Sequence, residues 1–370
     1  MRIVFDAYWW SSGPPSLRHV VRETVTAWKR EYPDDDILVV VRHKDADSAR
    51  DDVPPLVAVH GTRWWPQALV ATVACRRAAR LFDADVVYTQ NFAASTSRLS
   101  AVFIHDVLFV TNPEWFSWIE RRYFSLMPRL ASRADVVLTS SVTEAERIAG
   151  NSRAHRVVPV GIGLSTELIG HDDLDPVAGL APGRFLLTVG RLNIRKNLAN
   201  TIAGALRSEC VQVDNPLVVV GSANGRSERL PAWAERAVDD GRVRFTGFVS
   251  EAQLRWLYSN TSLFLFLSRA EGFGMPSMEA LHFGAPMIVS DIAVFREILP
   301  TAVPKVHPGD ITAISAAIRR VLTAEDAPSE RASMTGSRDY NWNNTVSSVR
   351  SELSRSLRDR AGPEALKGRP

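Results

Sequence analysis

Short apolar runs alternate with segments of helical length along nearly the whole chain, and this alternation restricts the fold more than any other feature. In the first half the predicted strands are 3–5, 37–41, 56–59, 86–88, 101–104 and 136–138. The segments 16–32, 67–81 and 115–132 have the length and apolar spacing of helices. Strands that alternate with helices form parallel sheets covered on both faces. The predicted fold class is therefore α/β.

The alternation restarts in the second half, where the predicted strands are 185–189, 217–220, 243–245, 263–267 and 287–290. Residues 164–183 between the halves are acidic and rich in glycine and proline, which is typical of a linker. We therefore predict two doubly wound domains, 1–163 and 184–340, followed by a C-terminal segment, 341–370, whose tail from about residue 361 frays. Ligands of such sheets bind beyond the carboxyl ends of the strands, so a cleft between the domains is the expected site.

Composition excludes several classes of protein. A chain of 370 residues with a formal net charge of only +3 lacks the strongly basic character of a nucleic-acid-binding protein. The N-terminus enters a strand pattern directly, so no signal peptide is expected, and no apolar run approaches the ~20 residues that span a bilayer. Cys75 and Cys210 are expected to be buried thiols, in keeping with a reducing compartment. We therefore expect a cytoplasmic protein and leave open a location at the inner face of the membrane.

Two carboxylates eight residues apart, Glu271 and Glu279, follow the predicted strand 263–267. Gly272 and Gly274 between them permit close approach of the backbone to a ligand. Pro276 is typical of the first turn of a helix, and a helix N-terminus is suited to binding phosphate. Either glutamate could simply complement the helix dipole; a carboxylate can also accept hydrogen bonds from sugar hydroxyls or a ribose diol.

A second loop, which is basic, lies after the predicted strand 185–189. It contains Gly190, Arg191 and Lys196, and Asn197 then stands where a helix N-cap is expected. Two cations beside a helix N-terminus are suited to a diphosphate. The alternative from spacing alone is a solvated basic turn.

In the first half, His105 and Asp106 follow the predicted strand 101–104 and so lie at a carboxyl end. A lone histidine is commonly structural, but this position and the neighbouring Asp106 favour a role in orientation or proton handling. Gly13 lies on a loop before the first predicted helix and could approach a phosphate, although the two prolines that follow it lack amide donors.

Metal binding is not predicted, because none of the Asp-x-Asp pairs directly follows a strand where a metal would meet a diphosphate. Seven of the ten tryptophans lie in the first half, and core packing accounts for most of them. For Trp64 and Trp65, beside Arg63, contact with an acceptor sugar or a membrane interface stays open.

Taken together, these segments resemble the retaining GT-B glycosyltransferases, most closely the mannosyl- and rhamnosyltransferase-like branch of glycosyltransferase family 4. The resemblance covers nearly the whole chain. Its motifs are the E-x7-E pair Glu271/Glu279, the segment from Gly190 to Asn197, the segments 157–161 and 245–258, and His105-Asp106 with the residues that follow.

The resemblance implies two Rossmann-like domains facing each other across a cleft, with a C-terminal helix around 341–357 that crosses back to the first domain. It implies metal-independent transfer of a sugar from a nucleotide-diphospho-sugar with retention of configuration. Arg191 and Lys196 would hold the diphosphate. Glu279 would bind the ribose, and Glu271 and His105 would lie beside the sugar.

The candidate catalytic residues are His105, Arg191, Lys196 and Glu271, and the candidate nucleotide-sugar contacts are Gly13, Gly190, Arg191, Lys196, Gly221, Phe248, Val249, Glu271, Gly272, Phe273, Gly274, Met275 and Glu279. The expected partners are a nucleotide-sugar donor, such as GDP-mannose, dTDP-rhamnose or GDP-fucose, and a glycan, glycolipid or glycoside acceptor. Two alternatives stay open: a GT-B-type nucleotide-sugar epimerase, and a non-catalytic nucleotide-sugar-binding module.

Overall fold

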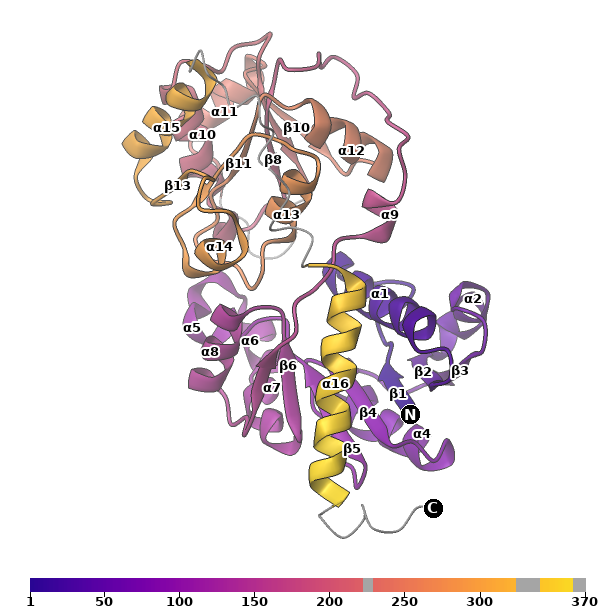
Figure 1. Ribbon diagram of the computed structural model, residues 1–370. Helices are drawn as coiled ribbons and strands as arrows, with labels where there is room; N and C mark the ends of the chain where they lie inside the picture. The colour runs from indigo at the N-terminus through magenta and orange to yellow at the C-terminus, as the bar shows by residue number, and fades with distance from the viewer. Residues whose placement is uncertain (222–228, 324–339, 362–370) are drawn as a thin grey trace. The chain divides into compact units, whose positions relative to one another are not determined.

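The computed structural model describes residues 1–221, 229–323 and 340–361, which form two compact units (Figure 1). Unit 1 contains Met1–Thr111, Ile119–Gly163 and the described residues from Tyr340 onward. Unit 2 contains Asn112–Trp118 and the described residues between Leu164 and Asp339. The predicted fraying tail lies outside the described residues, apart from its first residue.

Unit 1 is built on a seven-stranded parallel sheet with the strand order β3-β2-β1-β4-β5-β6-β7. The central strands are buried along their whole length, which explains why they appear in the sequence as continuous apolar runs rather than alternating ones. The strands are β1 (Arg2–Asp6), β2 (Asp36–Arg42), β3 (Val57–Thr62), β4 (Val86–Gln90), β5 (Leu99–Phe103), β6 (Val136–Thr139) and β7 (Val157–Pro159).

Helices connect these parallel strands, as in other doubly wound sheets. They are α1 (Pro15–Glu31), α2 (Ala46–Asp52), α3 (Gln67–Leu69), α4 (Cys75–Leu81), α5 (Leu108–Thr111), α6 (Trp118–Phe124), α7 (Leu126–Leu130) and α8 (Val142–Asn151), with a π-helical turn, η2 (Val70–Ala74), joining α3 to α4. The predicted helices 16–32 and 67–81 are confirmed.

The predicted continuous helix 115–132 is wrong, because the chain forms the short 3₁₀ turn η3 (Pro113–Trp115) followed by α6 and α7. Pro128 supplies the physical reason for the break between α6 and α7. It has no N–H to donate to the carbonyl of Phe124, and its ring would clash with that carbonyl in a continuous helix. The break therefore falls at Ser125, between the two short helices.

Helix α16 (Trp342–Ala361) packs on α1 within unit 1. The indole of Trp342 meets the ring of His19 edge to face, with ring centroids 5.6 Å apart. Arg350 donates to both carboxylate oxygens of the buried Asp35, at 2.7 and 3.1 Å. This bidentate pair holds the pKa of Asp35 at about 2, well below its ordinary value, although burial acts in the opposite direction. The C-terminal helix is thus fastened by both an aromatic and an ionic contact.

Unit 2 is built on a six-stranded parallel sheet with the order β10-β9-β8-β11-β12-β13. Its strands are β8 (Leu186–Val189), β9 (Leu217–Val220), β10 (Val243–Gly247), β11 (Leu263–Phe266), β12 (Met287–Ser290) and β13 (Lys305–Val306). Its helices are α9 (Thr166–Ile169), α10 (Leu198–Arg207), α11 (Ala232–Asp239), α12 (Glu251–Asn260), α13 (Met275–His282), α14 (Ala293–Ile298) and α15 (Ile311–Thr323). All five strands predicted for the second half are confirmed; the short edge strand β13 was not predicted.

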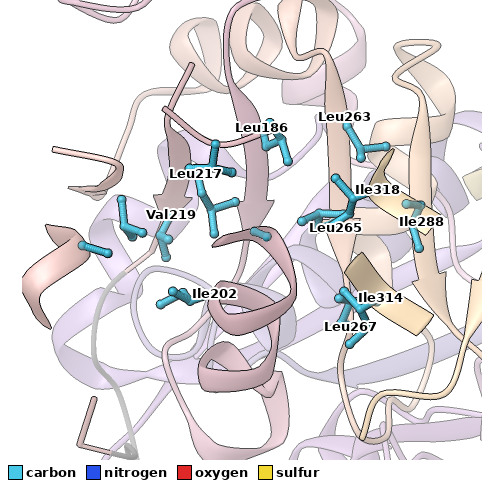
Figure 2. Packing of buried hydrophobic residues seen from close by; sticks show 14 of the residues in the cluster. Leu186, Ile202, Leu217, Val219, Leu263, Leu265, Leu267, Ile288, Ile314 and Ile318 are labelled. Carbon is cyan, nitrogen blue, oxygen red and sulfur yellow. The ribbon is translucent and has the colours of Figure 1, made fainter. Parts of the chain in front are cut away.

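One face of this sheet packs against α10 and α15 (Figure 2). Leu217 and Leu265 point from the strands toward Ile202 of α10 and Ile314 of α15, and all four side chains are fully buried. At Gly204 of α10 an added Cβ would lie 2.3 Å from Ile314, so a glycine there permits the close approach of the two helices. This rigid layer supports the loops at the carboxyl ends of β8 and β11.

Arg255 and Arg244 both donate hydrogen bonds from unit 2 to the acidic segment 164–183. The buried Arg255 of α12 donates to the carboxylate and carbonyl of Asp173, at 2.6 and 2.8 Å, and to the carbonyl of Glu167 at 2.9 Å. Because the guanidinium satisfies several carbonyls at once, it orders a segment with little apolar content of its own.

Candidate active site

Two cations and a carboxylate meet where β8 and β11 end. Lys196 lies on the 3₁₀ turn η5 (Ile194–Lys196) after β8, and its Nζ is 2.7 Å from Glu271 Oε1. Arg195 on the same turn donates to Glu271 Oε2 at 2.6 Å. The sequence predicted Lys196 and Glu271 for this site but not Arg195, whose place directly before Lys196 was the available signal.

Burial and charge act against each other in this cluster. Burial favours the neutral form of Glu271, but Arg195 and Lys196 outweigh it and hold the pKa of the carboxyl below its ordinary value. For Lys196 burial is the larger influence and lowers the pKa of the ammonium, while the carboxylate of Glu271 opposes the shift. An anionic ligand placed here would favour the charged form of Lys196.

The surroundings of Lys196 leave little room for its side chain to move. Its ammonium lies 4.3 Å from the centroid of the Phe266 ring, within cation–π distance. An added Cβ at Gly190 would lie only 2.9 Å from Lys196 Cε. Glycine at this position therefore makes space for the lysine directly beyond the end of β8.

Glycines also end the two neighbouring strands. Gly221 after β9 has φ +136°, and an added Cβ would lie 2.0 Å from the carbonyl oxygen of Gly190. Its N–H donates to the carbonyl of Gly247 at the end of β10, 2.9 Å away. The three adjacent strand ends thus form a rim of glycine backbone. An added Cβ would meet the protein at Gly190 and Gly221 but no atom of the described residues within 4 Å at Gly247, which a ligand can approach closely. Gly247 is a member of this rim that sequence reasoning did not single out.

Asn197 stands before α10 as predicted, but its side chain does not cap the helix. The residue has φ +57°, a left-handed conformation, and its Nδ2 donates to the carbonyls of Leu267 and Pro308 at 3.0 and 2.7 Å. Its Oδ1 accepts from Arg269 at 3.2 Å. The predicted N-cap position is confirmed, but the side chain makes no capping hydrogen bond and instead ties η5 to the loop that carries Glu271.

Helix α13 begins as the sequence predicted, with Pro276 in its first turn. Gly274 precedes it with φ +102°, and an added Cβ would lie 2.4 Å from the ring of Phe295, so only glycine fits there. Gly272 and Phe273 of this loop are buried, whereas Met275 is half-buried.

Glu279 is separate from the ion cluster and lies on α13. The hydroxyl of Tyr258 donates to its Oε2 at 2.8 Å. Burial raises the pKa of Glu279 to about 7, although the hydrogen bond from Tyr258 acts in the opposite direction. This carboxyl therefore changes charge near neutral pH. Tyr258 ends the motif segment 245–258, but its pairing with Glu279 was not predicted.

The remaining predicted residues of unit 2 lie on loops at the same edge of the sheet. Arg191 follows Gly190 and is half-buried. Phe248 follows β10 and is 87% exposed, whereas Val249 is half-buried. A large exposed aromatic ring beside the glycine rim offers a flat surface for a planar ligand group.

In unit 1, His105 is held by a buried polar chain at the ends of β1, β4 and β5. Its Nε2 donates to Gln90 Oε1 at 2.8 Å, which leaves Nδ1 as an acceptor. Gln67 Nε2 donates to the Gln90 carbonyl at 3.2 Å and to Asp6 Oδ2 at 3.1 Å. Burial lowers the pKa of His105 to about 3, so the imidazole is neutral at physiological pH.

Asp106, which follows His105 in the sequence, accepts with its Oδ1 from the N–H of Leu108, at 3.2 Å, at the start of α5. Gln90 orients His105, and its own Nε2 is buried without a hydrogen-bond partner in the described part of the chain. Gly13 has φ +123°, and an added Cβ would lie 2.0 Å from the indole of Trp9, so this glycine is required by local packing.

The described residues contain neither a cluster of metal-binding side chains nor a helix that could span a membrane. Across 1–221, 229–323 and 340–361, no three His, Cys, Asp or Glu side chains gather as a metal site requires. No helix in those ranges has the length and apolar character needed to cross a membrane.

Two Rossmann-like parallel sheets, with a basic cluster and a glycine rim at the strand ends of the second, define the GT-B class of glycosyltransferase fold. A solved structure of that class, Anabaena Alr3699/HepE in complex with UDP-glucose, covers 96% of this chain and 100% of its own at a TM-score of 0.66 and 18% identity. Residues 177–339 match the family model of the glycosyl transferases group 1. Residues 177–339 of the chain thus carry a group 1 glycosyltransferase domain.

Two relatives are similar in sequence. The O-antigen chain mannosyltransferase B of Escherichia coli is 29% identical over 252 residues, which are 65% of this chain and 66% of that protein. The GDP-mannose:cellobiosyl-diphosphopolyprenol alpha-mannosyltransferase of Xanthomonas oryzae pv. oryzae (strain PXO99A) is 36% identical over 118 residues, which are 31% of this chain and 30% of that protein. The alignments thus span about two thirds and under one third of these relatives.

Proposed function

We propose that this chain is a retaining glycosyltransferase of family 4 type that moves a hexose or deoxyhexose from a nucleotide-diphospho-sugar to a hydroxyl of a glycan, glycolipid or glycoside. The observation that carries the proposal is the cluster of Arg195, Lys196 and Glu271 where β8 and β11 end. Fixed cations at this edge of a Rossmann-like sheet are suited to a diphosphate leaving group.

The leaving diphosphate gains negative charge as the sugar–oxygen bond breaks. Lys196 lies beside the bare backbone rim at Gly190, so a phosphate can approach its ammonium without meeting a side chain at that position. Arg191 follows on the same loop. Cations that are already in place stabilise developing charge without reorganisation during the reaction. We propose that these side chains stabilise the negative charge that a metal ion would otherwise stabilise, and that the reaction requires no metal ion.

The nucleoside end of the donor is assigned to the neighbouring strand ends. Glu279 would accept hydrogen bonds from the ribose hydroxyls, and Phe248 and Val249 would lie beside the base. Glu271 would accept hydrogen bonds from the transferred sugar through the oxygen lone pairs that Arg195 and Lys196 do not occupy. His105 would offer Nδ1 as a neutral hydrogen-bond acceptor to the sugar, since its pKa of about 3 makes it a poor base.

Retention of configuration requires either a protein nucleophile or attack from the face that the leaving group vacates. Glu271 is a poor nucleophile, because both of its oxygens are engaged by cations at 2.6 and 2.7 Å. We therefore propose same-face attack, in which the departing phosphate accepts the proton of the acceptor hydroxyl and the sugar passes through an oxocarbenium-like state. The names of the two relatives favour a mannosyl donor, and GDP-mannose is the first to try.

The stereochemical outcome tests the proposed mechanism. With the purified protein and the donor that gives the largest thermal shift, the anomeric configuration of the product, read by NMR, is expected to equal that of the donor. An inverted product would exclude same-face attack. Conversion of the donor in the absence of any acceptor would instead favour an epimerase, and tight donor binding without turnover on a broad acceptor panel a binding module.

The pH dependence of donor binding tests the role of Glu279. Because the pKa of this carboxyl is raised to about 7, it is mostly protonated at pH 6 and mostly ionised at pH 8. The ionised form is the better acceptor of two ribose hydroxyls, while the diphosphate diester keeps its charge over this range. We expect the donor KM to fall by up to about 10-fold from pH 6 to pH 8.

Glu279→Gln is the matched control for that profile. The amide retains the shape of the side chain but does not titrate, so its donor KM is expected to be the same at both pH values. A Gln variant that keeps the full pH dependence would assign the titration to another group.

A further inference from the structure

The longest stretch of unit 1 that lacks any carboxylate runs from residue 53 to residue 82, between Asp52 and Asp83. It contains four arginines and one histidine. The structure folds it as the edge strand β3, the loop with Trp64 and Trp65, and the helical run α3–η2–α4. Its arginines, all exposed, are Arg63, Arg76, Arg77 and Arg80.

The same stretch exposes large apolar side chains, an uncommon combination on a soluble surface. Trp65 is 74% exposed and Leu81 84% exposed, and Trp64 and Leu69 are exposed to a lesser extent. We call this set of exposed residues, from Arg63 to Leu81, the basic–aromatic face. Its apolar residues do not join the core of unit 1, and its charges have one sign.

A hollow of about 390 Å³ lies within this face. It is lined by His60 and Arg63, which lie where β3 ends, and by Arg77 and Leu81 of α4. Trp64 forms part of its wall. Two guanidinium groups around a hollow of this size can hold a phosphate headgroup, because arginine binds phosphate through paired N–H donors.

We propose that the basic–aromatic face docks the protein on an anionic lipid surface, with lipid phosphates at Arg63 and Arg77 and the two indoles at the interfacial level of the bilayer. Charge complementarity carries this choice of occupant, since Arg63 and Arg77 line the hollow together and the thirty residues that form it contain no carboxylate. Tryptophan is enriched at membrane interfaces because it has a large apolar body and a polar N–H. A neutral acceptor glycan would need the indoles but not the arginines. This proposal does not depend on the proposed sugar-transfer reaction.

Flotation of the full-length protein with vesicles tests the proposal. We expect binding to vesicles of 30% phosphatidylglycerol in phosphatidylcholine, and at least about 10-fold weaker binding to pure phosphatidylcholine. The double variant Arg76→Gln/Arg77→Gln is expected to weaken binding to the anionic vesicles about 10-fold. Trp64→Ser/Trp65→Ser is expected to do the same and to abolish the part of the binding that resists 0.5 M salt, because apolar insertion is not screened.

The chain offers matched controls in unit 2. Arg319→Gln/Arg320→Gln removes two adjacent exposed arginines from α15, and Trp233→Ser removes an exposed indole from α11. Both controls are expected to bind anionic vesicles as the parent does. An equal loss in the controls would assign binding to net charge alone and overturn the proposal. Vesicle binding that is absent, or that is unchanged in both test variants while their thermal unfolding midpoints match the parent, would also overturn it.

Discussion

Lys196→Ala is expected to lower kcat/KM for sugar transfer by two to three orders of magnitude while the protein remains folded. The ammonium of Lys196 lies at the end of β8 beside the bare backbone of Gly190, where the proposed diphosphate gains charge as it leaves. Removal of one preorganised group that stabilises developing charge costs about 10²–10³-fold in rate. Because Arg195 remains 2.6 Å from Glu271, the buried carboxylate keeps a partner and the fold is expected to hold.

The control for this variant is Lys44→Ala, which removes an exposed lysine from a short 3₁₀ turn of unit 1. Its kinetics are expected to match those of the parent. Steady-state rates at saturating acceptor, with circular dichroism to verify the fold, provide the measurement. Turnover by Lys196→Ala within about threefold of the parent would exclude the proposed role of Lys196 at the diphosphate.

Glu271→Gln is the second variant with a large expected effect. The amide has nearly the same shape as the carboxylate but cannot neutralise Arg195 and Lys196, which lie at 2.6 and 2.7 Å. Loss of one partner from a buried ion cluster typically costs 3–5 kcal/mol, and we expect about 2–3 kcal/mol here because Arg195 is partly exposed. We expect kcat to fall about 100-fold as the contact with the sugar is lost.

Affinity for a free nucleoside diphosphate separates a binding role of the cations from a purely structural one. If Arg195 and Lys196 hold the diphosphate, Glu271→Gln removes a competing anion, and the Kd of the nucleoside diphosphate is not expected to rise. Urea unfolding and isothermal titration measure the two effects, with Glu235→Gln on the exposed face of α11 as the control. A 10-fold or larger rise in that Kd would show that the cations do not act on the diphosphate.

The alternation of apolar runs and helices was sufficient to predict the α/β class and every strand named from the sequence. This success has a simple cause. A strand buried on both faces needs an unbroken apolar run, and such a run can be recognised from a few consecutive residues. The edge strand β13 was missed because two residues are too few to show a pattern. The predicted helix 115–132 was too long because its apolar spacing continues through Pro128. Apolar spacing alone does not take the effect of a proline into account.

The spacing of residues in the sequence did not predict which side chains contact one another within the site. Glu271 and Lys196 are 75 residues apart and meet only because parallel strands β8 and β11 are neighbours in the sheet. His105 stands beside Asp106 in the sequence but bonds to Gln90, the last residue of β4, because neighbouring parallel strands bring their ends together. Adjacency along the chain gave no sign of this partner.

The sequence by itself determined which residue types stand at the ends of the strands, including the glycines that a left-handed backbone or close packing requires. These are local demands, met within a few residues of each position. Only the tertiary structure decided the charges. Burial brought the pKa of Glu279 to about 7, and the two cations kept Glu271 ionised, although both carboxyls belong to one motif. Solvation and long-range contacts set these differences, and neither is a property of a residue's neighbours in sequence.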